Sequence, residues 1–239
     1  MTSFTGQDLS GTEFRDVNLT GARMRGVLLM NADIDGVVGG LRINGVEVAP
    51  LIEAELNRLH PERTALRPAT PAGAREAVAV VDALWARTIA RVRTMPDGTA
   101  DRSVDGEWSV TETLRHLIFV SDAWFGHAVL GEPHPFHPAG LSPSFVTDSA
   151  RFGIDPAATP SFEETVGIRA TRRARLRAFL ATATQDDLDR VRDPNPAPGF
   201  PPPAARTAVS CLHVLLDEEW THHRFAVRDL ASIAADPAH

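Results

Sequence analysis

The stretch from Leu212 to Leu230 constrains this chain most, because it reads as one helix that carries acidic and imidazole groups among apolar side chains. One set of its residues recurs at steps of three or four and therefore shares a helix face. That set is Leu212, Leu216, Glu219, His223, Ala226 and Leu230. A buried glutamate beside a histidine is costly unless a partner satisfies both, and a divalent cation does so. The stretch therefore predicts a metal site that uses Glu219 and His223.

A second register of the same helix stays open. Glu218 and His222 are also four residues apart, and Leu215 and Phe225 lie on their face. We favour Glu219 with His223, because the apolar stripe on that face is the more continuous one.

Composition and charge limit the partners of the chain. The formal net charge is -7, whereas binding to nucleic acid or to an anionic membrane requires a positive surface. We therefore expect neither of those partners, and expect small molecules or proteins instead. No apolar run reaches the roughly 20 residues that span a bilayer, and residues 1–4 do not begin a signal peptide, so we expect a cytoplasmic protein. The single cysteine, Cys211, excludes an internal disulfide and is expected to be a buried core residue.

The N-terminal part of the chain repeats with a period of five residues. Its apolar positions are Phe4, Leu9, Phe14, Leu19, Met24, Leu29 and Ile34, separated by polar and small residues. Neither a helix nor a strand has this period, so the repeat predicts a solenoid in which each unit turns a corner and sends one apolar side chain to the axis. Residues 4–35 resemble the pentapeptide-repeat family, which implies a right-handed square β-helix. We expect a cap, a homodimer contact or a partner-docking module within a first unit, residues 1–49.

The first unit ends in an expected hairpin, and a linker follows it. Asn44-Gly45 is the signal of a tight turn between alternating apolar residues. Pro50 then opens a short amphipathic helix that Pro61 stops, within a linker at residues 50–71.

From residue 72 onward the apolar periodicity is helical. Helices are expected at 74–95, 109–130, 161–183 and 212–230, and four long helices make a four-helix bundle the natural architecture of a mainly α protein. The arginines at 169, 172, 173, 175 and 177 are spread around the third helix, and we interpret them as a solvated face. The long connection at 131–160 contains Pro133-His134-Pro135, which indicates an ordered flap, either over a pocket mouth or as a plain structural excursion.

A third metal ligand is available on the second of these helices. His116 follows Trp108-Ser109 and Glu112, and it lies among apolar residues. Together with the run from Glu219 to Arg224, this pattern resembles the DinB superfamily over residues 72–235, within a unit that extends from 72 to 239. The superfamily includes metal-dependent thiol S-transferases and the mycothiol-dependent maleylpyruvate isomerase.

The resemblance implies an up-down-down-up four-helix bundle and a metal site on His116, Glu219 and His223. The glutamate form, seen in the isomerase branch, replaces the commoner histidine. Two imidazoles and one carboxylate suit Zn²⁺, although Ni²⁺ and Fe²⁺ also accept such ligands. The cation would lower the pKa of a bound thiol, so the implied reaction transfers mycothiol, bacillithiol or glutathione to an electrophilic small molecule. No side chain of this protein needs to be the nucleophile.

Other residues are candidates for a supporting role or for the core. Proton shuttles could be Asp122, His127 or His137, which otherwise are surface or loop residues. The expected pocket residues are Trp108, Trp124, His137 and Trp220, although the tryptophans could equally be core.

Three functions remain open on the sequence. The first is a metal-dependent thiol transferase of the detoxification type. The second is a metal-dependent isomerase or hydrolase that uses a metal-bound water. The third is a non-catalytic metal-binding, stress-response or interaction protein that keeps the site residues without the chemistry and binds a partner through its repeat.

Overall fold

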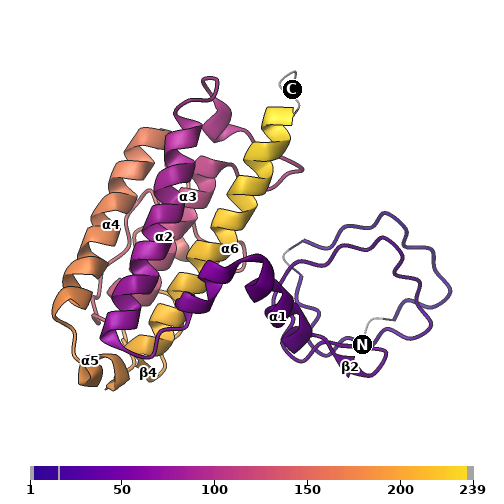
Figure 1. Ribbon diagram of the computed structural model, residues 1–239, viewed down its shortest axis with the longest axis horizontal. Coiled ribbons are helices and arrows are strands. Elements are labelled where there is room, and N and C mark those ends of the chain that lie inside the picture. The colour runs from indigo at the N-terminus through magenta and orange to yellow at the C-terminus, as the bar shows by residue number, and fades with distance from the viewer. Residues whose placement is uncertain (1–2, 16, 236–239) are drawn as a thin grey trace.

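The computed structural model describes residues 3–15 and 17–235 of the chain (Figure 1). The expectations for residues 1–2, 16 and 236–239 lie outside the described residues. The protein is mainly helical and its described strands form two small antiparallel pairs, so the mainly α prediction is confirmed.

Long helices make up most of the protein. They are α2 (Pro71–Val92), α3 (Val110–Ser121), α4 (Phe162–Thr182) and α6 (Ala208–Ala235). Each corresponds to an expected helix, with ends that differ by a few residues, and α3 is continued by a π-helical turn, η3 (Asp122–His127). The helices lie side by side, with α2 against α4 and α6, and α3 against the same two (Figure 1).

Helix α3 begins where the sequence predicts it to begin. Ser109 accepts a hydrogen bond from the backbone N–H of Glu112, and the Glu112 carboxylate accepts one from the backbone N–H of Ser109. This capping box satisfies backbone donors that a helix start otherwise leaves unpaired. Ser161 and Glu164 repeat the device at the start of α4. The cap fixes the first turn of α3 and therefore the helix face on which His116 lies.

Shorter elements connect the long helices. The hairpin pairs β1 (Arg42–Ile43) with β2 (Val46–Glu47), and its turn has positive φ at Asn44 and Gly45, as the Asn-Gly signal predicts. After it come α1 (Ala49–Leu59), η1 (Pro61–Leu66) and η2 (Thr99–Asp101). The later short elements are η4 (Ser149–Phe152), α5 (Gln185–Asp189), and the pair β3 (Val191–Arg192) and β4 (Arg206–Thr207).

The hydrophobic core lies between the long helices. Trp85, Leu114, Leu117, Leu216 and Leu230 are all almost completely buried there. Cys211 is also buried, as expected.

The connection at 131–160 is ordered against α3. The Phe136 ring lies 5.8 Å from the Phe119 ring, and the Leu141 N–H donates to the Arg115 carbonyl at 3.1 Å. The connection is therefore part of the packed structure around α3.

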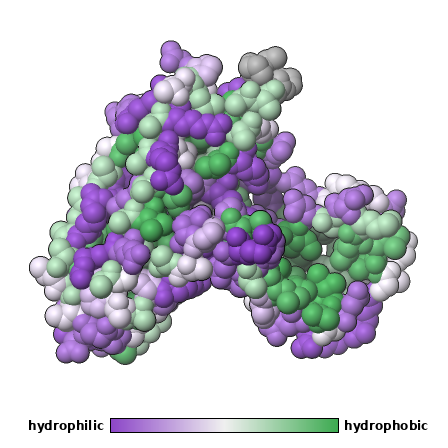
Figure 2. Space-filling view, viewed as in Figure 1, coloured by the Kyte–Doolittle hydropathy of each residue, from purple (hydrophilic) through white to green (hydrophobic). Residues whose placement is uncertain are grey.

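The N-terminal repeat turns a corner at regular intervals but buries little. Hydrogen bonds close turns from Thr12 to Leu9, from Ala22 to Leu19 and from Ala32 to Leu29. The apolar positions of the repeat remain 43% to 62% exposed, and Figure 2 shows apolar side chains gathered on this part of the molecule. So few coils leave the apolar interior largely open.

None of the described helices combines the length and the apolar character needed to cross a membrane.

Candidate metal centre

Three side chains from two helices converge on one point. His116 comes from α3, and Glu218 and His222 come from α6. One ligand atom from each lies within 4.8 Å of the other two. The Glu218 Oε2 atom is 3.4 Å from His116 Nε2 and 3.2 Å from His222 Nε2. The structure therefore places His116 together with the second register of α6, Glu218 and His222.

The tautomer of His116 follows from its backbone partner. His116 Nδ1 lies 3.0 Å from the Leu141 carbonyl oxygen, which can only accept, so Nδ1 carries the hydrogen. Burial lowers the pKa of His116, although Glu218 acts in the opposite direction, and we therefore take the imidazole to be neutral at pH 7. Its Nε2 lone pair then points at the Glu218 carboxylate. Two acceptors facing each other favour a cation between them.

Glu218 is poised to be negatively charged. Burial disfavours its ionised form, but the close contacts of its carboxylate with the His116 and His222 rings outweigh burial and lower the pKa of Glu218 to about 2. The carboxylate is a permanent anion at neutral pH and a suitable hard ligand for a divalent cation.

Aromatic rings surround the two imidazoles. The Trp108 ring lies 4.7 Å from the His116 ring and stacks on the His222 ring at 5.9 Å. Phe119 stacks on His116, and Phe225 meets His222 edge-on. These rings restrict how the imidazoles turn and limit the access of water. Trp108 is thus a neighbour of the site, as expected.

The favoured ligand Glu219 lies elsewhere, which corrects the sequence interpretation. It is completely buried and forms ion pairs with Arg169 and Arg173 of α4. Its backbone carbonyl accepts a hydrogen bond from the Trp85 indole at 3.2 Å. The continuous apolar stripe does mark the buried face of α6, but the carboxylate on that face is neutralised by arginines.

His223 is corrected in the same way. Its Nε2 lies 2.9 Å from the Thr88 hydroxyl, and its ring meets the Trp85 ring edge-on at 5.2 Å. Both partners belong to α2, so His223 faces away from His116 on α3.

The arginine run of α4 is not a uniformly solvated face. Arg169 and Arg173 are 5% and 2% exposed, and Arg173 also donates to Asp82 of α2 at 2.7 Å. The sequence analysis missed this role of the two arginines. The two arginines are four residues apart and so share a helix face. That spacing, together with a glutamate on the apolar face of another helix, could have indicated a buried ion pair.

Comparison with known protein families bears on this arrangement. The family model of the DinB superfamily matches residues 81–226, which is more than half of the chain and includes all three members of the metal group. This protein belongs to the DinB superfamily. The model of the pentapeptide repeats matches residues 2–36 in eight copies, so the N-terminal resemblance is also confirmed. Neither the curated proteins nor the solved structures contain a significant match.

The expected proton shuttles of this DinB protein lie outside the metal group. Asp122 is buried, which raises its pKa, and it accepts hydrogen bonds from Arg172 and from the backbone N–H of His137. His127 is also buried and lies 3.0 Å from the Asn195 side-chain nitrogen. These contacts tie η3 to the connection at 131–160, to α4 and to the segment before β4. They indicate a structural role.

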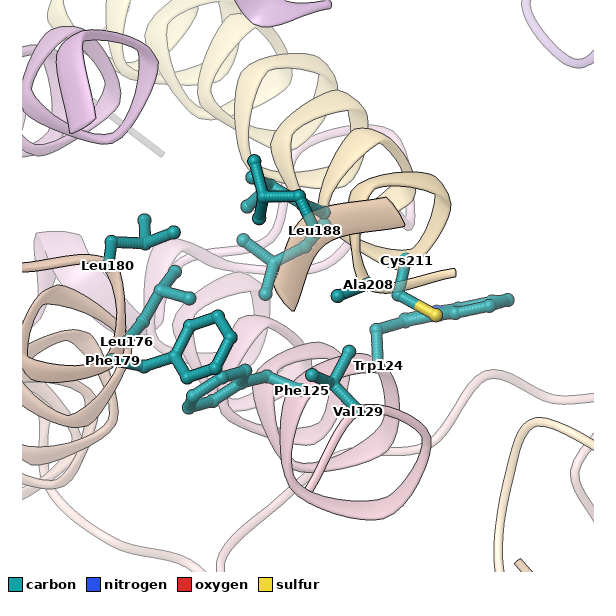
Figure 3. Close-up of a pocket in the computed structure, with 11 residues that line it drawn as sticks. Trp124, Phe125, Val129, Leu176, Phe179, Leu180, Leu188, Ala208 and Cys211 are labelled. Atoms are coloured by element: carbon teal, nitrogen blue, oxygen red, sulfur yellow. The ribbon is translucent and has the colours of Figure 1, made fainter. Parts of the chain in front are cut away.

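The other expected pocket residues are also separate from the group. Trp220 packs against His60 and beneath the guanidiniums of Arg63 and Arg224. Trp124 lines a small apolar cavity together with Cys211 (Figure 3). Side chains of η3, α4, α5 and α6 form the cavity walls, and His116, Glu218 and His222 are not among them.

Substitution of Glu219 tests its structural role. We expect Glu219→Gln to lower the free energy of unfolding by about 3 kcal/mol, because it leaves the buried Arg169 guanidinium without an anion and leaves Arg173 with Asp82 alone. The matched control is Glu218→Gln, which affects a partly exposed carboxylate and should cost about 1 kcal/mol or less. Urea denaturation of the metal-free proteins measures both values. Equal losses of unfolding free energy in the two variants would contradict a structural role for Glu219 that Glu218 does not share.

Acid titration tests the environment of His223. Burial lowers its pKa from 6.5 to about 4, so between these pH values the unfolded chain binds the additional proton. This contribution to stability is present above pH 6.5 and is lost as the pH falls towards 4. Between pH 7.5 and roughly pH 4.5 the free energy of unfolding falls for both proteins. We expect it to fall by about 2 kcal/mol less in His223→Gln, which can still bond Thr88, than in wild type. Urea denaturation at the two pH values measures this difference. Equal losses of unfolding free energy in wild type and His223→Gln would show that His223 does not titrate as a buried group.

Proposed function

We propose that this protein is a metal-dependent enzyme whose centre is formed by His116, Glu218 and His222. The observation that carries the proposal is the convergence of two imidazole nitrogens and one carboxylate oxygen within 4.8 Å. Membership of the DinB superfamily, which includes metal-dependent enzymes, supports it.

The donor set fits a divalent cation. His116 Nδ1 is held by the Leu141 carbonyl, which leaves Nε2 available as a ligand and orients the ring, as outer hydrogen bonds do in metal sites. Two neutral imidazoles and one carboxylate would leave a dication with a net charge of about +1 and with open coordination positions, which is typical of catalytic sites. We propose Zn²⁺ first, with Ni²⁺ or Fe²⁺ as alternatives.

The proposed reaction transfers a low-molecular-weight thiol to an electrophilic small molecule. The cation would lower the pKa of the thiol and supply a thiolate at neutral pH. Glu218 supplies the permanent negative charge that retains the cation, since its pKa is about 2. Trp108 covers both imidazoles and limits water on that side. Mycothiol, bacillithiol and glutathione are the proposed thiols.

We also propose that α2, α3, α4 and α6 form the up-down-down-up four-helix bundle of the superfamily. Each of the four packs against two of the others, which supports a closed arrangement. In this arrangement the candidate site lies between α3 and α6.

Metal content tests the centre itself. We expect wild type purified without a tag to hold close to one metal ion per chain after zinc is supplied. His116→Ala, Glu218→Gln and His222→Ala should each lose it, because each removes one of only three protein ligands. His223→Gln is the control and should retain the ion. The measurement is mass spectrometry of the metal, with circular dichroism to establish that each variant is folded. A folded wild type without metal, or a loss only in His223→Gln, would contradict the proposed ligands.

Activity with added thiol tests the reaction. We expect zinc-loaded wild type to consume an electrophile such as maleylpyruvate or a chlorinated aromatic compound only when mycothiol, bacillithiol or glutathione is present. Glu218→Gln should reduce this rate at least about 100-fold, because it loses the cation that activates the thiol. The rate is followed by disappearance of the electrophile, because a thiol that adds and is then eliminated, as in an isomerisation, is not consumed. Conversion that needs the metal but no thiol would instead support a metal-bound water and an isomerase or hydrolase.

A further inference from the structure

The N-terminal repeat meets the helical part of the protein beside the candidate metal centre. Arg15 reaches the turn that precedes α3, and Asp35 reaches α6 two residues beyond His222. Figure 1 shows the repeat next to α1, on the side of the helical part where α6 lies. Thus the repeat contacts α6 and the turn that leads into α3, next to both elements that carry the ligands.

The contact made by Arg15 holds an unusual turn. Its guanidinium donates to the carbonyls of Asp105 and Gly106 at 2.9 and 2.7 Å, and Glu13 holds it from the other side. Asp105 and Gly106 both have positive φ, which a non-glycine residue such as Asp105 adopts only with support from its surroundings. Two consecutive carbonyls of the turn depend on one side chain of the repeat.

The turn determines where Trp108 lies. Trp108 follows Gly106 by two residues and directly precedes Ser109, the N-cap of α3. Its indole packs on the rings of His116 and His222. A shift of the turn therefore displaces the ring that restricts both imidazoles.

The second contact reaches the same site through α6. Asp35 accepts a hydrogen bond from Arg224 at 2.9 Å, and the Arg224 guanidinium lies over the Phe225 ring. Phe225 in turn meets His222 edge-on. Asp35 is thus connected to a ligand through two intervening side chains.

We propose that Arg15 and Asp35 are positioning residues of the metal centre, so that the repeat supports the site from within the same chain. This inference rests on the proposed metal centre. Arg15 acts through the turn and Trp108, and Asp35 acts through Arg224 and Phe225. Neither touches the ligand atoms. Residues that orient ligands in this indirect way commonly change metal affinity by about 10- to 100-fold.

The test compares paired variants of the full-length protein. Arg15→Ala is matched by Arg25→Ala, and Asp35→Asn by Asp33→Asn. Arg25 and Asp33 are exposed residues of the same repeat that make no hydrogen bond or ion pair with the residues the structure describes. Loss of a positive charge at Arg15 would by itself strengthen cation binding, so a weaker affinity in Arg15→Ala cannot be a charge effect.

Two readouts are measured on each variant. The first is the NMR signals of the His116 and His222 ring protons in the metal-free protein, which the Trp108 ring shifts by its ring current. The second is the zinc affinity from competition with a chromophoric chelator. We expect Arg15→Ala to move both ring signals and to weaken zinc binding about tenfold, while Arg25→Ala changes neither. Asp35→Asn should move the His222 signals and weaken binding more than Asp33→Asn does.

The outcomes separate this inference from the proposed function. Ring signals and zinc affinity like those of wild type in Arg15→Ala and Asp35→Asn would overturn the positioning role, even if wild type binds zinc tightly. Wild type that binds no zinc would refute the metal centre, and the ring signals of the metal-free protein would then decide the positioning role alone. If Arg15→Ala does not fold, Asp35→Asn, which replaces one oxygen by an amide nitrogen, carries the test.

Discussion

The buried ion pairs of Glu219 with Arg169 and Arg173 set the rotation of α6, and the candidate metal centre depends on that rotation. A charge buried in a helical core is tolerated only with its partners in place, so turning α6 by one residue would strand all three groups. Glu219 is directed at α4 and His223 at α2. Their preceding neighbours, Glu218 and His222, are therefore directed at α3. The ion pairs that satisfy the buried Glu219 therefore also place Glu218 and His222 beside His116.

The chemistry of the site follows from what each ligand meets. A backbone carbonyl fixes the His116 tautomer, and the lowered pKa of Glu218 keeps it an anion. A neutral imidazole nitrogen and a carboxylate oxygen that face each other at 3.4 Å are both acceptors, so a cation between them stabilises the arrangement. The DinB superfamily, to which the chain belongs, includes metal-dependent enzymes, and the proposal of a metal rests on this donor set.

The N-terminal repeat gives the chain a second constraint. Its coils are too few to bury their apolar positions, yet Arg15 attaches it to the turn before α3 and Asp35 attaches it to α6. A module that looks independent in sequence is therefore joined to the site by polar contacts that span most of the chain. These contacts are the basis for the proposed role of the repeat in positioning the metal centre.

The sequence by itself determined the helices, the repeat and the hairpin, because these depend on local periodicity, caps and turn residues, and the resemblance to the DinB superfamily pointed to His116. Ser109 with Glu112 placed α3, and Asn44-Gly45 placed the hairpin. The choice between Glu218 and Glu219 was not local, since both lie on the same helix with a histidine four residues later. Only the tertiary structure decided it, because the arginines that neutralise Glu219 come from α4, about 50 residues earlier in the chain, and a buried carboxylate has the same periodicity whether its partner is a metal or a guanidinium.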